Sequence, residues 1–189
     1  MTLVSGLRAA AYGIPFQPVA GVFGSDLAKA NGWKTVVDPY SGSEVYAIPA
    51  LRPDVAVIHA QAIDEQGNAR VLGTPFWDHP ITRAARRVLI TAEQLVSTQE
   101  LARQPELTLV PHFMVEAAAV VPGGAWPGSC HPYYDVDYPA VEAYLEDSAE
   151  ALQRHLACAP EAGTAHPCAD APALPAAGGA PAPDLPRRD

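Results

Sequence analysis

The sequence is short of positive charge. It holds 12 lysines and arginines against 21 aspartates and glutamates, for a formal net charge of −9, and its densest basic cluster is only Arg83, Arg86 and Arg87. Affinity for a phosphate backbone comes from clustered Lys and Arg side chains. This acidic balance therefore argues against a nucleic-acid partner.

Long apolar runs are missing too. No run reaches the roughly 18 residues that a membrane span needs. The N-terminus also lacks the charged, apolar and small-residue order of a secretory signal. The sequence therefore predicts a cytoplasmic protein without a membrane segment.

Cysteine is scarce, with only Cys130, Cys158 and Cys168 in 189 residues. An odd number of cysteines makes no complete disulfide framework. Cys158 and Cys168, with His166 near them, fit no zinc-ligand spacing. Neither a structural disulfide nor a metal site is expected.

Common nucleotide and nucleophile motifs are absent. The sequence contains no G-x-G-x-x-G, no G-x-x-x-x-G-K-[ST] and no G-x-S-x-G. Ser129, Cys130 and His131 place a hydroxyl, a thiol and an imidazole side by side, but neighbours on an extended chain point apart. A loop cysteine is therefore favoured over a Cys130 nucleophile.

Hydrophobic residues make up 49% of the chain, which is enough for one domain, expected over residues 1–156. Residues 157–189 hold 11 alanines and 7 prolines and no aromatic residue. Such a segment buries too little apolar surface to offset its ordering entropy. It is predicted to be a disordered Pro/Ala-rich tail.

Apolar runs alternate with helical patterns along residues 1–156. Strands are predicted at Gln17–Phe23, Lys34–Val37, Glu44–Ile48, Asp54–Ala60, Ala69–Leu72, Val88–Thr91 and Leu107–Val110. Helices are predicted at Leu27–Ala30, Pro80–Arg87, Thr98–Arg103 and Pro139–Leu156, and Phe113–Val121 fits either type. The alternation predicts an α/β fold with a mostly parallel sheet and flanking helices.

Two of these segments have a more specific interpretation. Asp54–Ala60 is continuously apolar, which is typical of a strand buried on both faces. Asp64–Asn68 is a predicted tight turn, in which Gly67 and Asn68 tolerate positive φ.

The candidate binding residues gather in Pro122–Tyr134, which is rich in glycine, proline and aromatic residues. Gly123 and Gly124 allow close approach of the backbone to a ligand and can turn their N–H groups toward an anion. Ser129 lies in the same segment, and Trp126 and Tyr133 offer flat faces. A rigid packing segment explains the composition equally well.

His59 is a further candidate. It lies near the carboxyl end of a predicted strand, where ligands gather in open α/β sheets. A buried imidazole held by hydrogen bonds is the alternative interpretation.

Five segments, in order, carry a resemblance to a known family: Gly6–Phe16, Gly21–Asp26, Leu51–Asn68, Ala84–Val96 and Pro122–Asp137. They resemble, over Gly6 to about Leu156, the α subunits of family I coenzyme A transferases. The D-x-x-G-N turn ending at Asn68 is part of the pattern, whereas Gln99 stands where an acidic residue is common. The last segment resembles most the glutaconate-CoA-transferase-like branch, which includes subunits of a steroid-ring-opening CoA hydrolase.

The resemblance implies a NagB/RpiA-like α/β fold, a β-type partner subunit, acyl-CoA and carboxylate substrates, and coenzyme A as a substrate with no bound cofactor. In this family a glutamate attacks the acyl-CoA, giving an acyl anhydride and then a glutamyl-CoA thioester, and a second carboxylate reverses these steps. That glutamate usually sits in an S-E-N-G-type motif of the β subunit, and the motif does not occur in this sequence.

The resemblance also implies that the sequence is the C-terminal part of such a subunit, N-terminally incomplete. Family α subunits begin with a longer region that carries a glycine-rich loop, and in the hydrolase branch the catalytic glutamate precedes the position of Met1. No catalytic residue is carried over, and the chain alone is expected to be inactive. The following glutamates match no catalytic motif: Glu44, Glu65, Glu93, Glu100 and Glu116.

Two other functions stay open. One is the α subunit of a CoA-dependent ring-opening hydrolase of the same fold, and the other is a non-catalytic α/β binding or assembly module. A β-type gene with S-E-N-G beside this one favours the transferase, and one without it favours the hydrolase. A gene without such a neighbour favours the module.

Overall fold

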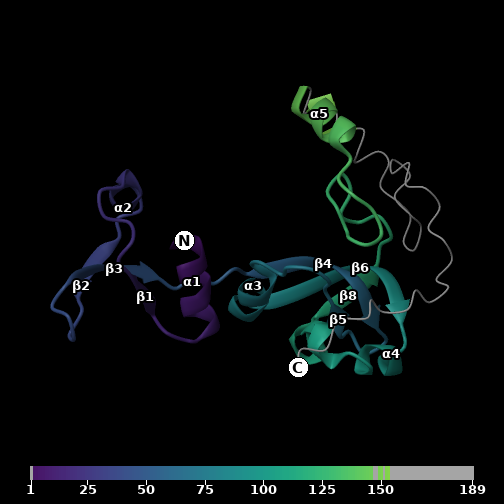
Figure 1. Cartoon of the computed structure of the whole chain (residues 1–189), viewed down its shortest axis with the longest axis horizontal. Helices are drawn as coiled ribbons and strands as arrows, with labels where there is room; N and C mark the ends of the chain where they lie inside the picture. The colour runs from purple at the N-terminus through teal and green to yellow at the C-terminus, as the bar shows by residue number, and fades with distance from the viewer. Residues whose placement is uncertain (1, 147–148, 151, 154–189) are drawn as a thin grey trace, which may run out of the picture.

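The computed structural model describes residues 2–146, 149–150 and 152–153, which form an α/β structure with two separate sheets (Figure 1). This is the predicted fold class. The predicted tail at 157–189, and the boundary before it, lie outside the described residues. No helix in the described part of the chain combines the length and apolarity that a membrane crossing needs.

The elements follow one another with short connections. The first part of the chain contains α1 (Thr2–Ala11), β1 (Phe16–Val19), α2 (Asp26–Ala30), β2 (Lys34–Val37) and β3 (Glu44–Pro49). The second part contains β4 (Val55–Asp64), β5 (Ala69–Arg70), α3 (Asp78–Ala84), β6 (Arg87–Val96), α4 (Thr98–Ala102), β7 (Thr108–Val110), β8 (Ala117–Val120) and α5 (Tyr138–Glu146). Short 3-10 helices cover Pro105–Leu107 and His112–Met114.

The smaller sheet is antiparallel, in the order β1-β3-β2. The strand predicted at Gln17–Phe23 ends at Val19, because the following residues turn and Ser25 N–H donates to the Val22 carbonyl. Ser25 then caps α2, as its hydroxyl accepts from the Leu27 N–H at 3.2 Å.

Helix α1 packs between the two sheets. Its Leu7 and Ala10 form a small buried cluster with Ala84 of α3. On its other side α1 contacts β1 and β3, and a Cβ on Gly6 would lie 3.1 Å from the Pro49 carbonyl. Glycine therefore lets the helix lie close to the segment after β3, where a larger residue would require its neighbours to shift by a few tenths of an ångström.

The larger sheet has the order β7-β5-β4-β6-β8. Strands β4, β6 and β8 are parallel, with Ile58 opposite Ile90 and Leu89 opposite Ala117. The predicted parallel arrangement holds for these three strands. The ambiguous Phe113–Val121 segment begins in the 3-10 helix His112–Met114 and is strand only at Ala117–Val120. β5 is antiparallel to β4, because the tight turn after β4 returns the chain beside it. β7 is in turn antiparallel to β5.

Helix α3 differs from the prediction of Pro80–Arg87. It begins at Asp78 and ends at Ala84. The N–H groups of Arg86 and Arg87 donate to the carbonyls of Pro53 and Asp54, which draws the chain out of the helix and into β6. Because Arg87 pairs with the sheet, the last turn of the predicted helix does not form, and Arg87 begins β6 instead.

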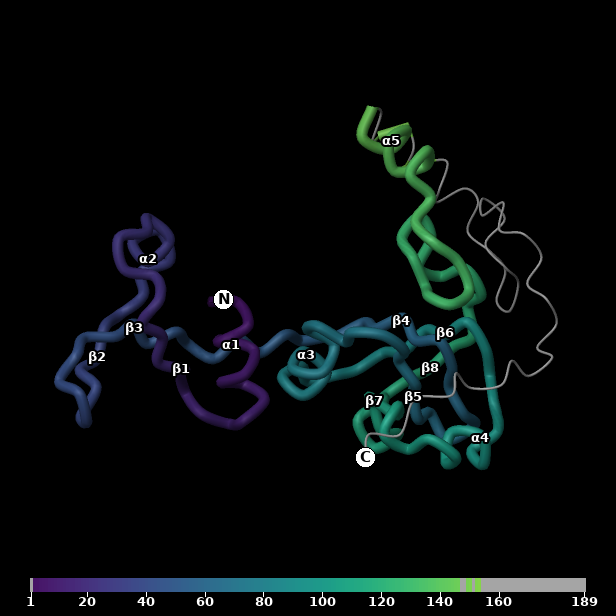
Figure 2. The backbone as a smooth tube through the Cα atoms, in the orientation of Figure 1, coloured from purple at the N-terminus to yellow at the C-terminus, as the bar shows by residue number. Residues whose placement is uncertain are grey.

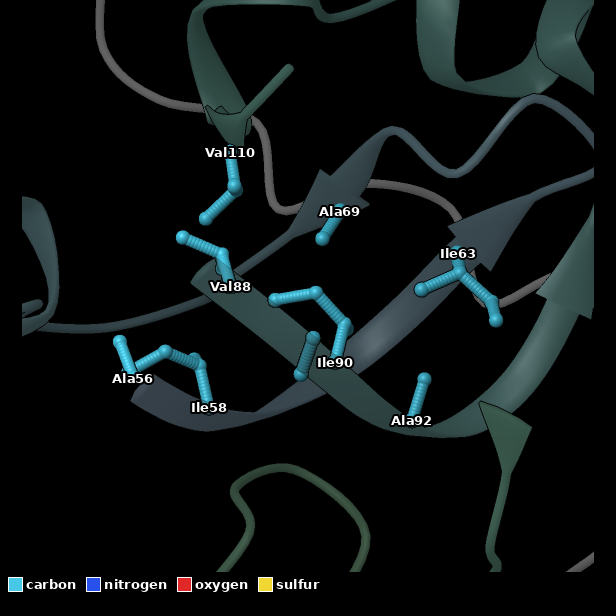
Figure 3. Close-up of a cluster of buried hydrophobic side chains, with 9 residues drawn as sticks. Ala56, Ile58, Ile63, Ala69, Val88, Ile90, Ala92 and Val110 are labelled. Carbon is cyan, nitrogen blue, oxygen red and sulfur yellow. The ribbon is translucent and has the colours of Figure 1, made fainter. Parts of the chain in front are cut away.

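The main hydrophobic core lies on one face of the larger sheet. Figure 3 shows the side chains of this cluster on the side of β4 and β6 where Val110 lies. The buried members are Ala56, Ile58, Ala60, Ile63, Ala69, Val88, Ile90, Ala92 and Val110. Small and branched side chains alternate here, which allows neighbouring strands to pack closely.

The opposite face corrects the prediction that Asp54–Ala60 is buried on both sides. Val55 and Val57 are 39% and 65% exposed, whereas Ala56 and Ile58 between them are buried. One covered face gives this alternation. From Ala60 onward β4 is fully buried, because the segment after β8 covers the second face there.

The helix predicted at Pro139–Leu156 begins one residue earlier, and its first part is α5. No residue of α5 is buried, and Tyr144 and Leu145 are 46% and 74% exposed. Figure 1 shows α5 at the outer end of the segment that follows β8, away from both sheets. The apolar stripe predicted for this helix is therefore not covered by the described residues.

Candidate functional site

Residues 121–137, called the loop segment from here on, rise from the end of β8 and fold back over the larger sheet before they enter α5 (Figure 2). The loop segment covers the later part of the face of β4 and β6 that lies opposite the hydrophobic core, beyond the exposed Val57. Polar side chains occupy that covered face, namely His59 and Gln61 of β4 and Thr91 and Glu93 of β6.

Glu93 lies at the centre of this cluster, with only 1% of its side chain exposed. Its Oε1 atom accepts from the Tyr134 hydroxyl at 2.6 Å and lies 2.7 Å from His59 Nε2. Its Oε2 atom accepts from the Gly123 N–H at 2.8 Å. A buried carboxylate is costly unless it is fully hydrogen-bonded, and here both oxygens have partners.

These contacts assign the protons. An ionised carboxylate only accepts, so His59 carries its proton on Nε2 and donates to Glu93. The other ring nitrogen, Nδ1, lies 2.8 Å from the Thr91 hydroxyl oxygen, within hydrogen-bond distance. Both ring nitrogens of His59 are thus used inside the protein.

The surroundings of Glu93 also shift pKa values. Burial would raise the pKa of Glu93, but hydrogen bonds from His59, Tyr134 and Gly123 together outweigh it and lower that pKa. Burial, together with the nearby Glu93 charge, raises the pKa of the Cys130 thiol to about 12. Burial and the bond to Glu93 also raise the pKa of Tyr134. These shifts keep the Glu93 carboxylate ionised and the Cys130 thiol and Tyr134 phenol protonated.

Gly124 packs directly against His59. A Cβ built on Gly124 would lie 2.7 Å from His59 Cε1, 2.9 Å from His59 Nδ1 and 2.9 Å from the Val121 carbonyl oxygen. Real Cβ atoms do not approach other atoms this closely. Glycine at 124 therefore serves a close approach within the protein.

A second anchor holds the loop segment farther along. Gln61, which is 7% exposed, donates through Nε2 to the carbonyl of His131 at 2.8 Å. Its Oε1 atom accepts from the Leu72 N–H at 2.9 Å. Within the segment, the Ala125 N–H donates to the Tyr134 hydroxyl and Trp126 Nε1 donates to Asp137. The segment is an internally bonded block fixed to the sheet at two points.

The structure brings three of the four candidate binding residues together: His59, Gly123 and Gly124. The N–H of Gly123 does face an anion, as expected of this segment, but that anion is the carboxylate of Glu93. The Gly124 N–H donates to the Val121 carbonyl. Ser129 lies apart from this cluster on the exposed surface of the loop segment.

The predicted turn at Asp64–Asn68 is present and is structural. Gly67 has a φ of +93°, which suits glycine, whereas Asn68, which also tolerates a positive φ, does not adopt one. Asn68 instead donates through its side chain and its N–H to the Asp64 carboxylate, both at 2.8 Å. Its side-chain oxygen accepts from the His112 N–H, which ties the turn to the segment after β7.

One group among the described residues has the composition of a metal site. The ligand atoms of His59, Glu93 and Cys130 lie within 4.8 Å of one another. The imidazole and carboxylate already satisfy each other, and the thiol is held protonated by its raised pKa. Thiolate is the form that binds metal, so this donor set matches a hydrogen-bonded cluster better than a cation site.

Glu93 and Tyr134 are the residues that sequence reasoning missed. Glu93 matches no catalytic motif, and Tyr134 was only the last residue of the unusual segment. A signal was present in β6: Glu93 follows the largely apolar run from Val88 to Ala92, and an acidic side chain in such a buried strand needs partners. The sequence does not reveal which residues supply them.

The coenzyme A transferase family model matches residues 1–120. The A-type subunit of glutaconate CoA-transferase from Acidaminococcus fermentans is 34% identical over 72% of this chain and 48% of its own length. The IpdA subunit of the cholesterol ring-cleaving hydrolase from Mycobacterium tuberculosis is 36% identical over 75% of this chain and 52% of its own.

Solved structures give the same result. A variant of the decarboxylase AibA/AibB is 37% identical, with a TM-score of 0.73 over 82% of this chain and 59% of the matched one. The A. fermentans glutaconate CoA-transferase structure is 31% identical, with a TM-score of 0.74 over 82% of this chain and 55% of the matched one. The chain spans about half the length of the two curated relatives. The family match covers well over half of the chain, and the protein belongs to the coenzyme A transferase family.

Proposed function

We propose that this chain forms part of the A-type, or α, subunit of a coenzyme A transferase, which moves CoA between an acyl-CoA and a carboxylic acid. The observation that carries this proposal is the family match over residues 1–120, together with the similarity to the A-type subunit of glutaconate CoA-transferase. Coenzyme A is then a substrate, no cofactor is bound, and the enzyme works in the cytoplasm.

The reacting glutamate belongs to a B-type partner subunit in this proposal. Its carboxylate attacks the thioester carbonyl, CoA leaves as thiolate, and an acyl anhydride forms. The thiolate then attacks the glutamyl carbonyl of the anhydride, releasing the acyl carboxylate and leaving a glutamyl-CoA thioester. A second carboxylate repeats the two steps in reverse and leaves as the new acyl-CoA.

The environment of Glu93 supports placing the nucleophile on the partner. Glu93 is the buried glutamate of the larger sheet, and its two oxygens hold three hydrogen bonds. Only 1% of its side chain is exposed, so a substrate carbonyl has no access to this carboxylate as it stands. Attack by Glu93 would first require the loop segment that covers it to move and its hydrogen bond from Gly123 to break.

This chain contributes a wall of the acyl-binding site in the proposal. Gly124 and Ser129 lie on the exposed side of the loop segment, which is rigidly attached to the sheet. Their small size leaves room for a substrate against the backbone. The role of Gly123 and His59 is then to support this surface from below.

Exposed apolar side chains supply a surface for the B-type partner. Val57 of β4 and Leu145 of α5 are 65% and 74% exposed, and neither is covered by the described residues. Large exposed apolar surface marks interaction sites. Burial of these side chains against a second subunit explains why they are apolar.

The test is acyl exchange by the assembled enzyme. The chain is co-expressed with a B-type subunit, and the complex is given an acyl-CoA and a labelled free carboxylate. Transfer of CoA to the labelled acid is expected from the complex and not from the 189-residue chain alone. Full activity of the isolated chain would overturn the assignment of the nucleophile to the partner.

A second candidate is the ring-opening hydrolase activity, because the IpdA subunit is as similar as the transferase subunit, at 36% against 34% identity. The same assay separates the two. A transferase needs the acceptor carboxylate to turn over, whereas a hydrolase consumes its CoA ester with water alone.

A further inference from the structure

We propose that Glu93 is a positioning residue, which fixes the loop segment in the place where its outer surface forms the acyl-binding wall. This inference rests on the proposed function. Glu93 does not touch the substrate; it acts through Gly123, Tyr134 and His59. The number and direction of the hydrogen bonds that this one buried carboxylate accepts suit it to that role.

The three donors to Glu93 come from different parts of the chain. Gly123 starts the loop segment and Tyr134 ends its return, 30 and 41 residues after Glu93, and His59 belongs to the neighbouring strand 34 residues before it. One carboxylate thus joins the two ends of the loop segment to each other and to β4. Moving either end by about 1 Å would break a bond of normal length.

A buried charge is an expensive way to attach a loop. An apolar contact would hold the segment without the desolvation cost of a carboxylate. The hydrogen bonds also fix the orientation of the loop segment, because a fully satisfied polar network restricts its members to one arrangement. The close contact of Gly124 with His59 fixes the remaining distance, since nothing larger than glycine fits there.

The loop segment exposes the small residues Gly124 and Ser129 on its surface. Gly124 is exposed although its neighbour Gly123 is bonded to Glu93 beneath it. Displacement of Gly123 would therefore move the exposed backbone by a similar amount. Misplacement of a binding surface by about 1 Å can lower the rate about 100-fold.

The test compares Glu93→Gln and Tyr134→Phe with the wild-type holoenzyme. Glutamine keeps the shape but presents an NH₂ group to one of the donors, and phenylalanine removes one donor only. Glu116→Gln is the matched control, because Glu116 also accepts two hydrogen bonds on this sheet, from Arg87, but is exposed and far from the loop segment. The control is expected to behave as wild type.

The hydrogen bonds that Gly123, Tyr134 and His59 make to Glu93 are called the clamp from here on. Amide hydrogen exchange tests the clamp without any activity measurement. The N–H groups of Gly123 and Ala125 donate to side-chain oxygens of Glu93 and Tyr134, so their exchange depends on those side chains. Both amides are expected to exchange about 10-fold faster or more in Glu93→Gln. Tyr134→Phe is expected to speed up Ala125 more than Gly123. Unchanged exchange in both variants would overturn the clamp.

Kinetics decides whether the clamp serves catalysis. In the assembled enzyme, kcat/KM is expected to fall about 10- to 100-fold in Glu93→Gln and less in Tyr134→Phe. Should Glu93→Gln not assemble, Tyr134→Phe alone carries the test. Faster exchange with wild-type kcat and KM would show a purely structural cluster and overturn the proposal. A wild-type holoenzyme without acyl transfer contradicts the proposed function instead, and the exchange data still decide on the clamp.

Discussion

Replacing Gly124 by alanine should destabilise the protein, because the added methyl group has no free space. Its carbon would lie 2.7 Å from His59 Cε1 and 2.9 Å from both His59 Nδ1 and the Val121 carbonyl. Two of these three contacts involve one side chain. His59 must therefore rotate away, which breaks its contacts with Thr91 and Glu93, or the loop segment must lift from the sheet.

Either change lowers the free energy of unfolding, and its size can be estimated. Forcing an extra methyl group into a packed site costs about 1–3 kcal/mol. A chain of this size loses about 2–4 °C of melting temperature for each kcal/mol. Gly124→Ala should therefore lower the melting temperature of the protein by roughly 2–12 °C.

Thermal unfolding followed by circular dichroism measures this effect. Gly21→Ala is the matched control, because a Cβ on Gly21 has no atom within 4 Å and its φ is not in the left-handed region. The control should unfold within about 2 °C of wild type, since surface substitutions of this kind cost less than about 0.5 kcal/mol.

A double variant tests the cause. In a His59→Ala background the methyl group at 124 loses two of its three clashes, so Gly124→Ala should cost less there than in wild type. The contact with the Val121 carbonyl remains, so some cost should persist. If the losses of stability caused by the two substitutions simply add, the explanation that a methyl group at position 124 clashes with the His59 side chain is refuted.

Three further predictions concern single side chains. The folded pKa of Glu93 is depressed, so its contribution to stability should be full above the unfolded pKa of about 4.3 and should disappear as the pH falls through the lower folded value. Glu93→Gln should remove this part of the acid dependence in unfolding titrations below about pH 5. The pKa of Cys130 is about 12, so its thiol should resist iodoacetamide at about pH 8 in the folded protein and react once urea unfolds it. The measurement uses a variant that lacks the other two cysteines, and rapid labelling of the folded protein would contradict the burial of Cys130. Asp64→Ala should cost about 1–3 kcal/mol in chemical denaturation, because three buried hydrogen bonds are lost, whereas the exposed turn residue Asp38 should tolerate alanine better.

Local signals in the sequence predicted much of the fold. Ser25 caps α2 because its hydroxyl reaches an N–H two residues away, and Gly67 turns the chain because it alone there has a positive φ. Such features depend on neighbours along the chain. They were therefore accessible from the sequence, and so was the order of strands and helices.

The errors arose where distant residues decide the outcome. Val57 was expected to be buried, yet its face of β4 is covered only from about Ala60 onward. α3 was expected to continue to Arg87, but the backbone of residues 53–54 pairs with that segment. The hydrophobic pattern gives no information on what covers a strand or competes for a backbone donor.

The polar cluster shows the same limit for the candidate site. His59 and the two glycines were selected from their local setting, and the structure places them together. Glu93 matches no catalytic motif, and its partner Tyr134 lies 41 residues away with no motif that connects the two. A glutamate within a buried strand is a signal that a partner exists, but only the fold identifies that partner.

Whether the reacting glutamate lies on the partner can be read from the mass of both polypeptides after reaction with acyl-CoA alone. A CoA transferase without an acceptor acid stops at the glutamyl-CoA thioester, so one polypeptide should gain the mass of CoA less one water. We expect this adduct on the B-type partner and an unmodified mass for the chain described here, in both the wild type and Glu93→Gln. An adduct on this chain would contradict the proposed mechanism, and so would release of free CoA with no adduct on either polypeptide.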